Sequence, residues 1–215
     1  TGYRTDRDEA ADIAARASIP EKTAVLVRTN RQLRPFEDEC LTRGIRYNLL
    51  GRSGFWQRAE IQDLLAFITV VEKPWDDNAV ARIIRAPYKC SKYLGVKFLA
   101  ALPKPYLDNL SHFQVPGAPP YQREAAKKLY EFLMRLRRDA LDMARPEWAV
   151  DNILEEAGMR AYFQRDADET EGDNEALENL DEALVVAARF ASLGDLLAHA
   201  QRAIHAAKNR SGLTL

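Results

Sequence analysis

Ala24-Val25-Leu26-Val27, followed by the polar residues Arg28-Thr29-Asn30, is the stretch that decides the fold class. A short, partly β-branched apolar run that ends abruptly in polar residues is typical of a buried strand entering a loop. Residues 30–44 then carry apolar side chains at helical spacing and end at Gly44, a residue common at helix ends. Because residues 45–50 form a second candidate strand, the sequence predicts a strand–helix–strand unit in a parallel α/β layer.

The rest of the chain is predicted to be mainly helical. Residues 61, 64, 65, 68 and 71 are all apolar, which is the stripe of an amphipathic helix. Other helices are expected at residues 6–17, 79–85, 121–143, 146–158, 175–191 and 193–207. A Pro-rich stretch at residues 103–120 and an acidic stretch at residues 166–178 are the expected connectors, and residues 212–215 resemble the opening of a strand.

These segments indicate an insertion. An α/β fragment occupies roughly the first 75 residues, an all-helical segment follows, and a strand begins at the very end. The expected fold class is therefore α/β plus mainly α, in which the chain leaves a sheet, forms a helical subdomain and returns. With 215 residues, no initial Met and a strand cut short at the end, the chain is expected to be a piece of a larger protein.

Composition and motifs exclude several functional classes. Two cysteines, Cys40 and Cys90, are too few for a disulfide framework, and Cys40 lies on an apolar helix stripe, which favours a core position. No apolar run reaches the roughly 20 residues of a membrane span. Phosphate-binding Gly-rich loops, Cys-x-x-Cys, His-Glu-x-x-His and Gly-x-Ser-x-Gly motifs are missing from the sequence. We therefore predict no catalytic, cofactor-binding or metal-binding residue within this chain.

The distribution of charge points to nucleic acid, although the formal net charge is only -1. The interval between Asp77 and Asp108 has six bases and no acid, with four aromatic residues among the bases. Lys and Arg dominate non-specific affinity for nucleic acid through phosphate contacts, and exposed aromatic rings stack on bases. The alternative is a solvated helix face whose aromatic residues belong to the core. The acidic stretch at residues 166–178 is a solvated connector or a surface that repels nucleic acid.

Arg28 and Asn30 are a second candidate contact. Polar groups at the carboxyl end of a parallel strand lie where α/β folds place ligands. Arg pairs with phosphate and Asn bonds to a base or the backbone. The alternative is that Asn30 caps the following helix and Arg28 is simply exposed.

Five segments resemble the UvrD/Rep/PcrA-type superfamily 1 DNA helicases. Ala24-Val25-Leu26-Val27-Arg28-Thr29-Asn30-Arg31-Gln32-Leu33-Arg34 resembles their "VLYRTNAQSR", and Gly44-Ile45-Arg46-Tyr47 resembles "GIPY". Gly51-Arg52-Ser53-Gly54-Phe55-Trp56-Gln57-Arg58-Ala59-Glu60-Ile61-Gln62-Asp63 resembles "GGxxFFERxEIKD", Ala86-Pro87 resembles "NxP", and Leu177-Glu178-Asn179-Leu180-Asp181-Glu182 resembles "ExENLxEL". Their order and spacing match along essentially the whole chain.

The resemblance implies a domain organisation. Residues 1–75 would be part of the second RecA-like domain (2A), residues 76–207 the inserted helical 2B subdomain, and residues 208–215 the start of the strand returning to 2A. The linkers near residues 73–77 and 208–212 would be the hinges. The resemblance also implies DNA contact by one set of residues, namely Arg28, Asn30, Phe55, Arg58, Arg85, Lys89 and Lys92. In place of the family's Gly-rich "GIG" hairpin, this chain has Tyr88-Lys89-Cys90-Ser91-Lys92-Tyr93-Leu94-Gly95.

The resemblance implies that the parent protein is an ATP-dependent helicase or translocase moving 3′ to 5′ along DNA, with ATP and magnesium bound elsewhere in it. The fragment alone is predicted to be inactive, and its partners would be single-stranded DNA, junctions of single and double strands, and the remaining helicase domains. A cytoplasmic, nucleoid-associated bacterial or phage-like protein without membrane contact is expected. The alternatives are a helical protein-interaction module and a helicase-like subunit of a helicase-nuclease.

Overall fold

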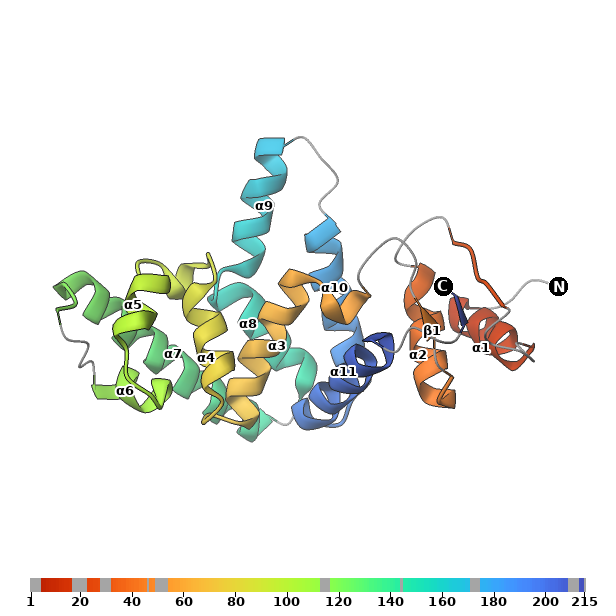
Figure 1. Cartoon of the computed structure of the whole chain (residues 1–215), viewed down its shortest axis with the longest axis horizontal. Helices are drawn as coiled ribbons and strands as arrows, with labels where there is room; N and C mark the ends of the chain where they lie inside the picture. The colour runs from red at the N-terminus through yellow and green to blue at the C-terminus, as the bar shows by residue number, and fades with distance from the viewer. Residues whose placement is uncertain are drawn as a thin grey trace. The chain divides into compact units, whose positions relative to one another are not determined.

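A computed structural model of the chain describes residues 5–16, 23–27, 32–45, 47–48, 54–112, 117–143, 145–170, 175–208 and 213–214. The chain divides into two compact units (Figure 1). Unit 1 comprises Thr1–Arg58 and Ala198–Leu215, and unit 2 comprises Ala59–Leu197. Unit 2 is therefore one continuous stretch of chain, whereas unit 1 is built from both ends of it.

Unit 1 has a small core under two helices. Its elements are α1 (Asp6–Arg16), α2 (Leu33–Arg43), β1 (Tyr47–Asn48), the 3₁₀ turn η3 (Phe55–Gln57), the C-terminal part of α11 (Leu193–Lys208) and β2 (Leu213–Thr214). Ala10, Phe36, Cys40 and Tyr47 form the buried cluster, which confirms the core position predicted for Cys40. Gly44 ends α2 as predicted, with a left-handed φ of 66° and its N–H bonded to the carbonyls of Cys40 and Leu41.

The strands of unit 1 are shorter than the sequence predicts. Tyr47 pairs with Leu213 and Asn48 with Thr214 in a parallel register, so the expected strand at the chain's end is present. Residues 24–27 do not form the predicted buried strand, because only Ala24 has bridge pairing and Leu26 is 95% exposed. Val25 and Val27 pack against the buried cluster while the side chain between them faces away from it, so this run is covered on one side only.

Unit 2 is entirely helical in the part that the structure describes, as the sequence predicts for the inserted region. Its elements are α3 (Ala59–Glu72), α4 (Asp77–Arg85), the 3₁₀ turn η4 (Lys89–Ser91), α5 (Val96–Ala101), α6 (Tyr106–His112), α7 (Pro120–Met143), α8 (Pro146–Glu156), α9 (Met159–Thr170), α10 (Glu175–Ala187) and the start of α11. No helix among the described residues is long and apolar enough to cross a membrane.

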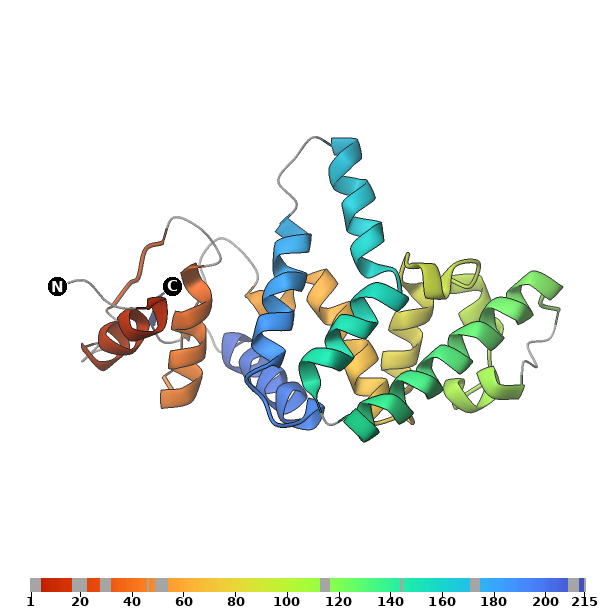
Figure 2. The ribbon, with the colours of Figure 1, turned by 180° about the vertical axis from the view of Figure 1, so that it is seen from behind.

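Helix α3 is the centre of unit 2. It packs against α4, α7, α8 and α10, and the two opposite views show these helices around it (Figure 2). The predicted stripe is buried, but so are Ala66, Phe67 and Val70 on other faces of the helix. Because α3 packs within unit 2, the two compact units divide between residues 58 and 59.

The two expected connectors contain helical segments. Helix α6 lies inside the Pro-rich stretch, where its first N–H, that of Tyr106, donates to Asp77 Oδ1 at 2.7 Å. Buried Leu107 and Leu110 anchor that helix. Within the acidic stretch, α9 extends to Thr170 and α10 begins at Glu175. Carboxylates in the first turn of a helix are stabilised by its dipole, which suits Glu175 and Glu178 to the start of α10.

Candidate nucleic-acid interface

Residues 82–104, here called the basic segment, follow a well-defined helix start. Asp76 caps α4, its side chain accepting from the N–H groups of Asn78 at 3.0 Å and Ala79 at 3.1 Å. The helix ends at Arg85, before Pro87, and the chain continues through η4 into α5. The segment contains five exposed cations, namely Arg85, Lys89, Lys92, Lys97 and Lys104.

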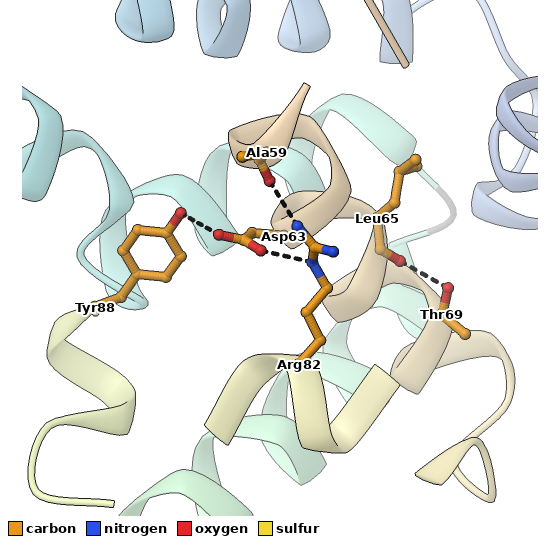
Figure 3. Close-up of polar contacts among 6 residues, drawn as sticks. All are labelled: Ala59, Asp63, Leu65, Thr69, Arg82 and Tyr88. Atoms are coloured by element: carbon orange, nitrogen blue, oxygen red, sulfur yellow. Dashed lines mark hydrogen bonds and ion pairs between the residues drawn. The ribbon is translucent and has the colours of Figure 1, made fainter. Parts of the chain in front are cut away.

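Two cations of the basic segment have acidic partners. Arg82 Nε donates to Asp63 Oδ1 at 2.6 Å, and Arg82 Nη2 donates to the carbonyl of Ala59 at 3.0 Å (Figure 3). Lys104 Nζ lies 3.9 Å from Asp77 Oδ2. The interval between Asp77 and Asp108 contains no acid in sequence. In the folded chain, however, Asp63 of α3 and Asp77 at the start of the interval lie beside two of its cations.

The aromatic residues of the segment divide into core and surface. Tyr88 is 1% exposed and donates its hydroxyl to Asp63 Oδ2 at 2.6 Å (Figure 3). Burial, together with the hydrogen bond to Asp63, raises the pKa of Tyr88 above its ordinary value, so the phenol stays protonated and remains a donor. Phe98 is also buried. Tyr88 and Phe98 therefore belong to the core, as in the alternative interpretation of the sequence, whereas Tyr93 is 58% exposed.

A pocket of about 410 Å³ opens beside Lys89 and Lys92. Its lining comes from the basic segment, from α7 and from the end of α8, and consists of Lys89, Cys90, Lys92, Tyr93, Tyr121, Glu124, Ala125, Lys128, Phe132, Arg135 and Glu156. Phe132 on α7 is nearly fully buried, whereas the rings of Tyr93 and Tyr121 are largely exposed. The predictions from sequence missed the α7 residues, although an aromatic Tyr121 off the apolar stripe is a signal in hindsight.

Lys89 is held against the turn between α8 and α9. The N–H of Cys90 donates to the carbonyl of Ala157 at 3.2 Å. At Gly158, which has φ of 80°, an added Cβ would lie 2.7 Å from Lys89 Cβ. Glycine is required at residue 158 both by the positive φ and by the close approach of Lys89. The turn and the basic segment are therefore in direct contact at this point.

The predicted contacts in unit 1 have a different setting. Arg28 and Asn30 lie outside the described residues. Phe55 is buried, with the Arg34 guanidinium 4.7 Å from its ring centroid and 4.7 Å from that of Trp56. A buried ring cannot stack on a base in this arrangement. The position of Phe55 is therefore better suited to holding its neighbours Arg34 and Trp56 in place than to stacking on DNA. Arg58 is partly exposed.

A buried group of charges surrounds Arg34. Its guanidinium lies 3.6 Å from Glu37 Oε2 and 2.9 Å from Asp38 Oδ1, and His199 Nε2 lies 3.3 Å from the same Asp38 oxygen. Burial raises the pKa of Glu37 to about 7, opposed by the positive charges of Arg34 and Arg58 and by the backbone N–H of Phe55.

Two of the sequence motifs meet in unit 2. Asn179 Nδ2 on α10 donates to Glu60 Oε1 on α3 at 2.7 Å, across 119 residues of sequence. Glu60 belongs to the segment at residues 51–63 and Asn179 to the segment at residues 177–182. The same α3 segment supplies Asp63, which holds Tyr88 and Arg82. These motif residues therefore link α3 to α10 and to the basic segment.

The UvrD-like helicase C-terminal domain family matches residues 4–103. The matched range includes every residue predicted to contact DNA, and the resemblance to UvrD/Rep/PcrA-type helicases is confirmed.

Curated relatives extend the similarity over most of the chain. The ATP-dependent DNA helicase PcrA of Bacillus subtilis (strain 168) is 28% identical over 172 residues, covering 78% of this chain and 23% of the relative. The PcrA of Leuconostoc citreum is 29% identical over 208 residues, covering 88% of this chain and 27% of the relative. The chain thus spans about a quarter of the length of these UvrD-like helicases.

Proposed function

We propose that the chain is part of an ATP-dependent DNA helicase or translocase and contributes DNA contact through its basic segment. One observation carries the proposal: Arg85, Lys89 and Lys92 are exposed on the family-matched stretch and make no ion pair within the described residues. Exposed cations that no protein acid neutralises release counterions when they meet phosphates, which is the main source of non-specific affinity for DNA.

The finer assignment follows the resemblance. Residues 1–75 form part of a RecA-like 2A domain and residues 76–207 a 2B subdomain, with Arg28, Asn30, Phe55 and Arg58 near the path of the single strand. The parallel pairing of β1 with β2 and the packing of α1 with α2 support an α/β layer continued by other parts of the parent protein. The parent protein moves 3′ to 5′, and a change in orientation of the helical subdomain regulates it.

ATP and magnesium belong to other parts of the parent protein. The sequence has no Gly-x-x-x-x-Gly-Lys-Ser/Thr loop. The described residues include no group of three or more His, Cys, Asp or Glu side chains that could hold a metal ion.

The partners of the site are single-stranded DNA, junctions of single and double strands, and the remaining domains of the parent protein. The names of the PcrA relatives support DNA as the substrate class. A helical protein-interaction module and a helicase-like subunit of a helicase-nuclease are the competing functions. The first predicts no affinity for DNA.

The proposal is tested by fluorescence anisotropy with a labelled thymidine oligonucleotide, titrated with the chain at several salt concentrations. We expect weak, salt-dependent binding that falls about tenfold in the double variant Lys89→Ala/Lys92→Ala. The affinity of Arg28→Ala for the same oligonucleotide tests the predicted DNA contact in unit 1 separately. Lys127→Ala is the control for each single substitution, Lys89→Ala or Lys92→Ala, because it also removes one charge from an exposed lysine; Lys127 lies on α7, 3.9 Å from Glu131.

Equal loss in the control variant would mean that only net charge matters. Binding that is indifferent both to salt and to the lysine substitutions would contradict the proposal and favour the interaction module.

A further inference from the structure

We propose that the pocket between the basic segment and α7 takes one unpaired nucleobase of a bound single strand. The inference rests on the proposed function, since it names what the DNA places at this site. The pocket's volume of about 410 Å³ lies in the range of small-ligand sites, which are mostly apolar with a few polar groups.

The walls of the pocket offer aromatic surface. Tyr93 and Tyr121 are each 58% exposed, and their rings meet edge to face with centroids 5.8 Å apart. Phe132 adds buried apolar surface from α7. Large exposed aromatic rings are unfavourable in water, whereas every nucleobase has a flat face that stacks on such rings.

The backbone holds Tyr93 in an uncommon conformation. Its φ is 77°, in the left-handed region that disfavours a bulky side chain, and glycine would fit there without that cost. The carbonyl of Tyr93 accepts from Gln122 Nε2 at 3.0 Å, and Lys92 Nζ lies 5.0 Å from the ring centroid. The hydrogen bond from α7 therefore holds the backbone of Tyr93, and Lys92 lies over its ring, at a position where backbone strain would favour glycine.

The charges around the pocket favour a nucleotide over an acidic peptide. Lys128 lies 3.5 Å from Glu124, and Arg135 pairs with Glu156, so these two cations are largely neutralised. Lys89 and Lys92 have no ion pair within the described residues and remain for a phosphate. The carboxylates of Glu124 and Glu156 can accept from the N–H groups of a base, which an acidic side chain does not have.

The experiment compares two labelled probes that have the same number of phosphates. One is a short thymidine oligonucleotide and the other is an oligomer of abasic sugars. We expect the full chain to bind the thymidine probe about tenfold more tightly, because stacking adds to phosphate contact only where bases are present.

Tyr93→Gly and Tyr121→Ala should each abolish that difference and leave affinity for the abasic probe unchanged. Tyr93→Gly also relieves the left-handed backbone, so its melting midpoint should be unchanged or higher and loss of binding cannot be assigned to unfolding. Tyr93→Phe keeps the ring and should retain the preference. Trp75→Ala removes another exposed ring, 72% exposed and outside the pocket, and should have no effect.

Equal affinity for both probes, with salt-dependent binding intact, would overturn the base pocket and leave the proposed function standing. A preference for bases that survives both tyrosine substitutions would also overturn it, because the stacking rings would then lie elsewhere. Failure of both probes to bind would overturn the proposed function and the pocket together.

Discussion

At the scale of single residues, Asp63 organises the candidate interface. One carboxylate accepts from Arg82 on α4 and from the buried hydroxyl of Tyr88, and thereby joins α3 to α4 and to the residue that directly precedes Lys89 (Figure 3). Buried polar groups are costly when they lose their partner, which makes this residue more important for the segment than its own exposure suggests.

Asp63→Ala should destabilise the helical unit by about 2 kcal/mol, since it leaves the Tyr88 hydroxyl buried without an acceptor. Adding Tyr88→Phe to that variant should restore part of the loss by removing the unpaired donor. Urea unfolding of the two single variants and the double variant measures the coupling. Strictly additive losses would show that the two side chains do not act together.

Glu37 should make unfolding depend on pH. Its folded pKa of about 7 exceeds the ordinary value of 4.5, so the folded state holds the proton more tightly. The stabilisation is complete below about pH 4.5 and is lost as pH rises through about 7, amounting to at most about 3 kcal/mol. Other charged groups face Glu37, namely Arg34, Asp38 and Arg58, so the pH dependence of the wild-type protein is compared with that of a Glu37 variant.

Glu37→Gln should flatten the fall in melting midpoint between about pH 5 and about pH 8, because its amide does not titrate. Circular dichroism melts of both proteins across this range make the comparison. A wild-type midpoint that rises over the same interval would contradict the raised pKa.

At the scale of elements, the turn between α8 and α9 packs against the basic segment at Lys89 and Cys90. Gly158 combines a left-handed φ with the close approach of Lys89, and η4 packs on α7 and α4. The position of the exposed lysines therefore depends on helices that lie far from them in sequence.

Gly158→Ala should cost about 1–3 kcal/mol and weaken DNA binding, because the added methyl group displaces Lys89. Gly117→Ala is the matched control: φ there is 74°, but nothing lies within 4 Å of an added Cβ. Thermal melts and anisotropy should show a stability loss in both variants and a binding defect only at Gly158. Equal affinity for DNA in the two variants would show that the turn at Gly158 does not influence the candidate interface.

Most of the long helices could be predicted from sequence because a stripe of apolar residues is enough to define them, but α9 (Met159–Thr170) was not predicted. Helix α7 occupies Pro120–Met143, close to the predicted 121–143. The six- and seven-residue helices α5 and α6 were not predicted, since contacts such as that of Asp77 with the N–H of Tyr106 stabilise them. The pocket could not be predicted either, because Tyr93, Tyr121 and Glu156 come together only through tertiary packing.

At the scale of the whole molecule, most basic residues are balanced by acidic ones, so few cations would be available to contact DNA phosphates. Thirty-one basic residues are balanced by 32 acids, and many cations in the described part, such as Arg160 with Asp151, Glu155 and Asp181, are held in ion pairs. The interface therefore has to rely on a small exposed set rather than on a general positive potential.

The dependence of DNA affinity on salt should accordingly be shallow. If Arg85, Lys89 and Lys92 make the phosphate contacts, log K should fall with log salt at a slope of about -2 for a single strand. Anisotropy at several salt concentrations gives the slope, and Lys92→Ala should reduce its magnitude by about 0.7. A slope twice as steep would require additional cations outside the basic segment.

The pairing of Tyr47 and Asn48 with Leu213 and Thr214 also constrains the order of folding. Bringing together strands from opposite ends of the chain carries a loop-closure cost and slows folding when the contacts are remote in sequence. Unit 2 builds its core from contiguous chain, so it can collapse first and shorten the flexible interval that remains. During synthesis, Tyr47 and Asn48 leave the ribosome well before Leu213 and Thr214, so this strand pairing can form only after the whole of unit 2 has been made.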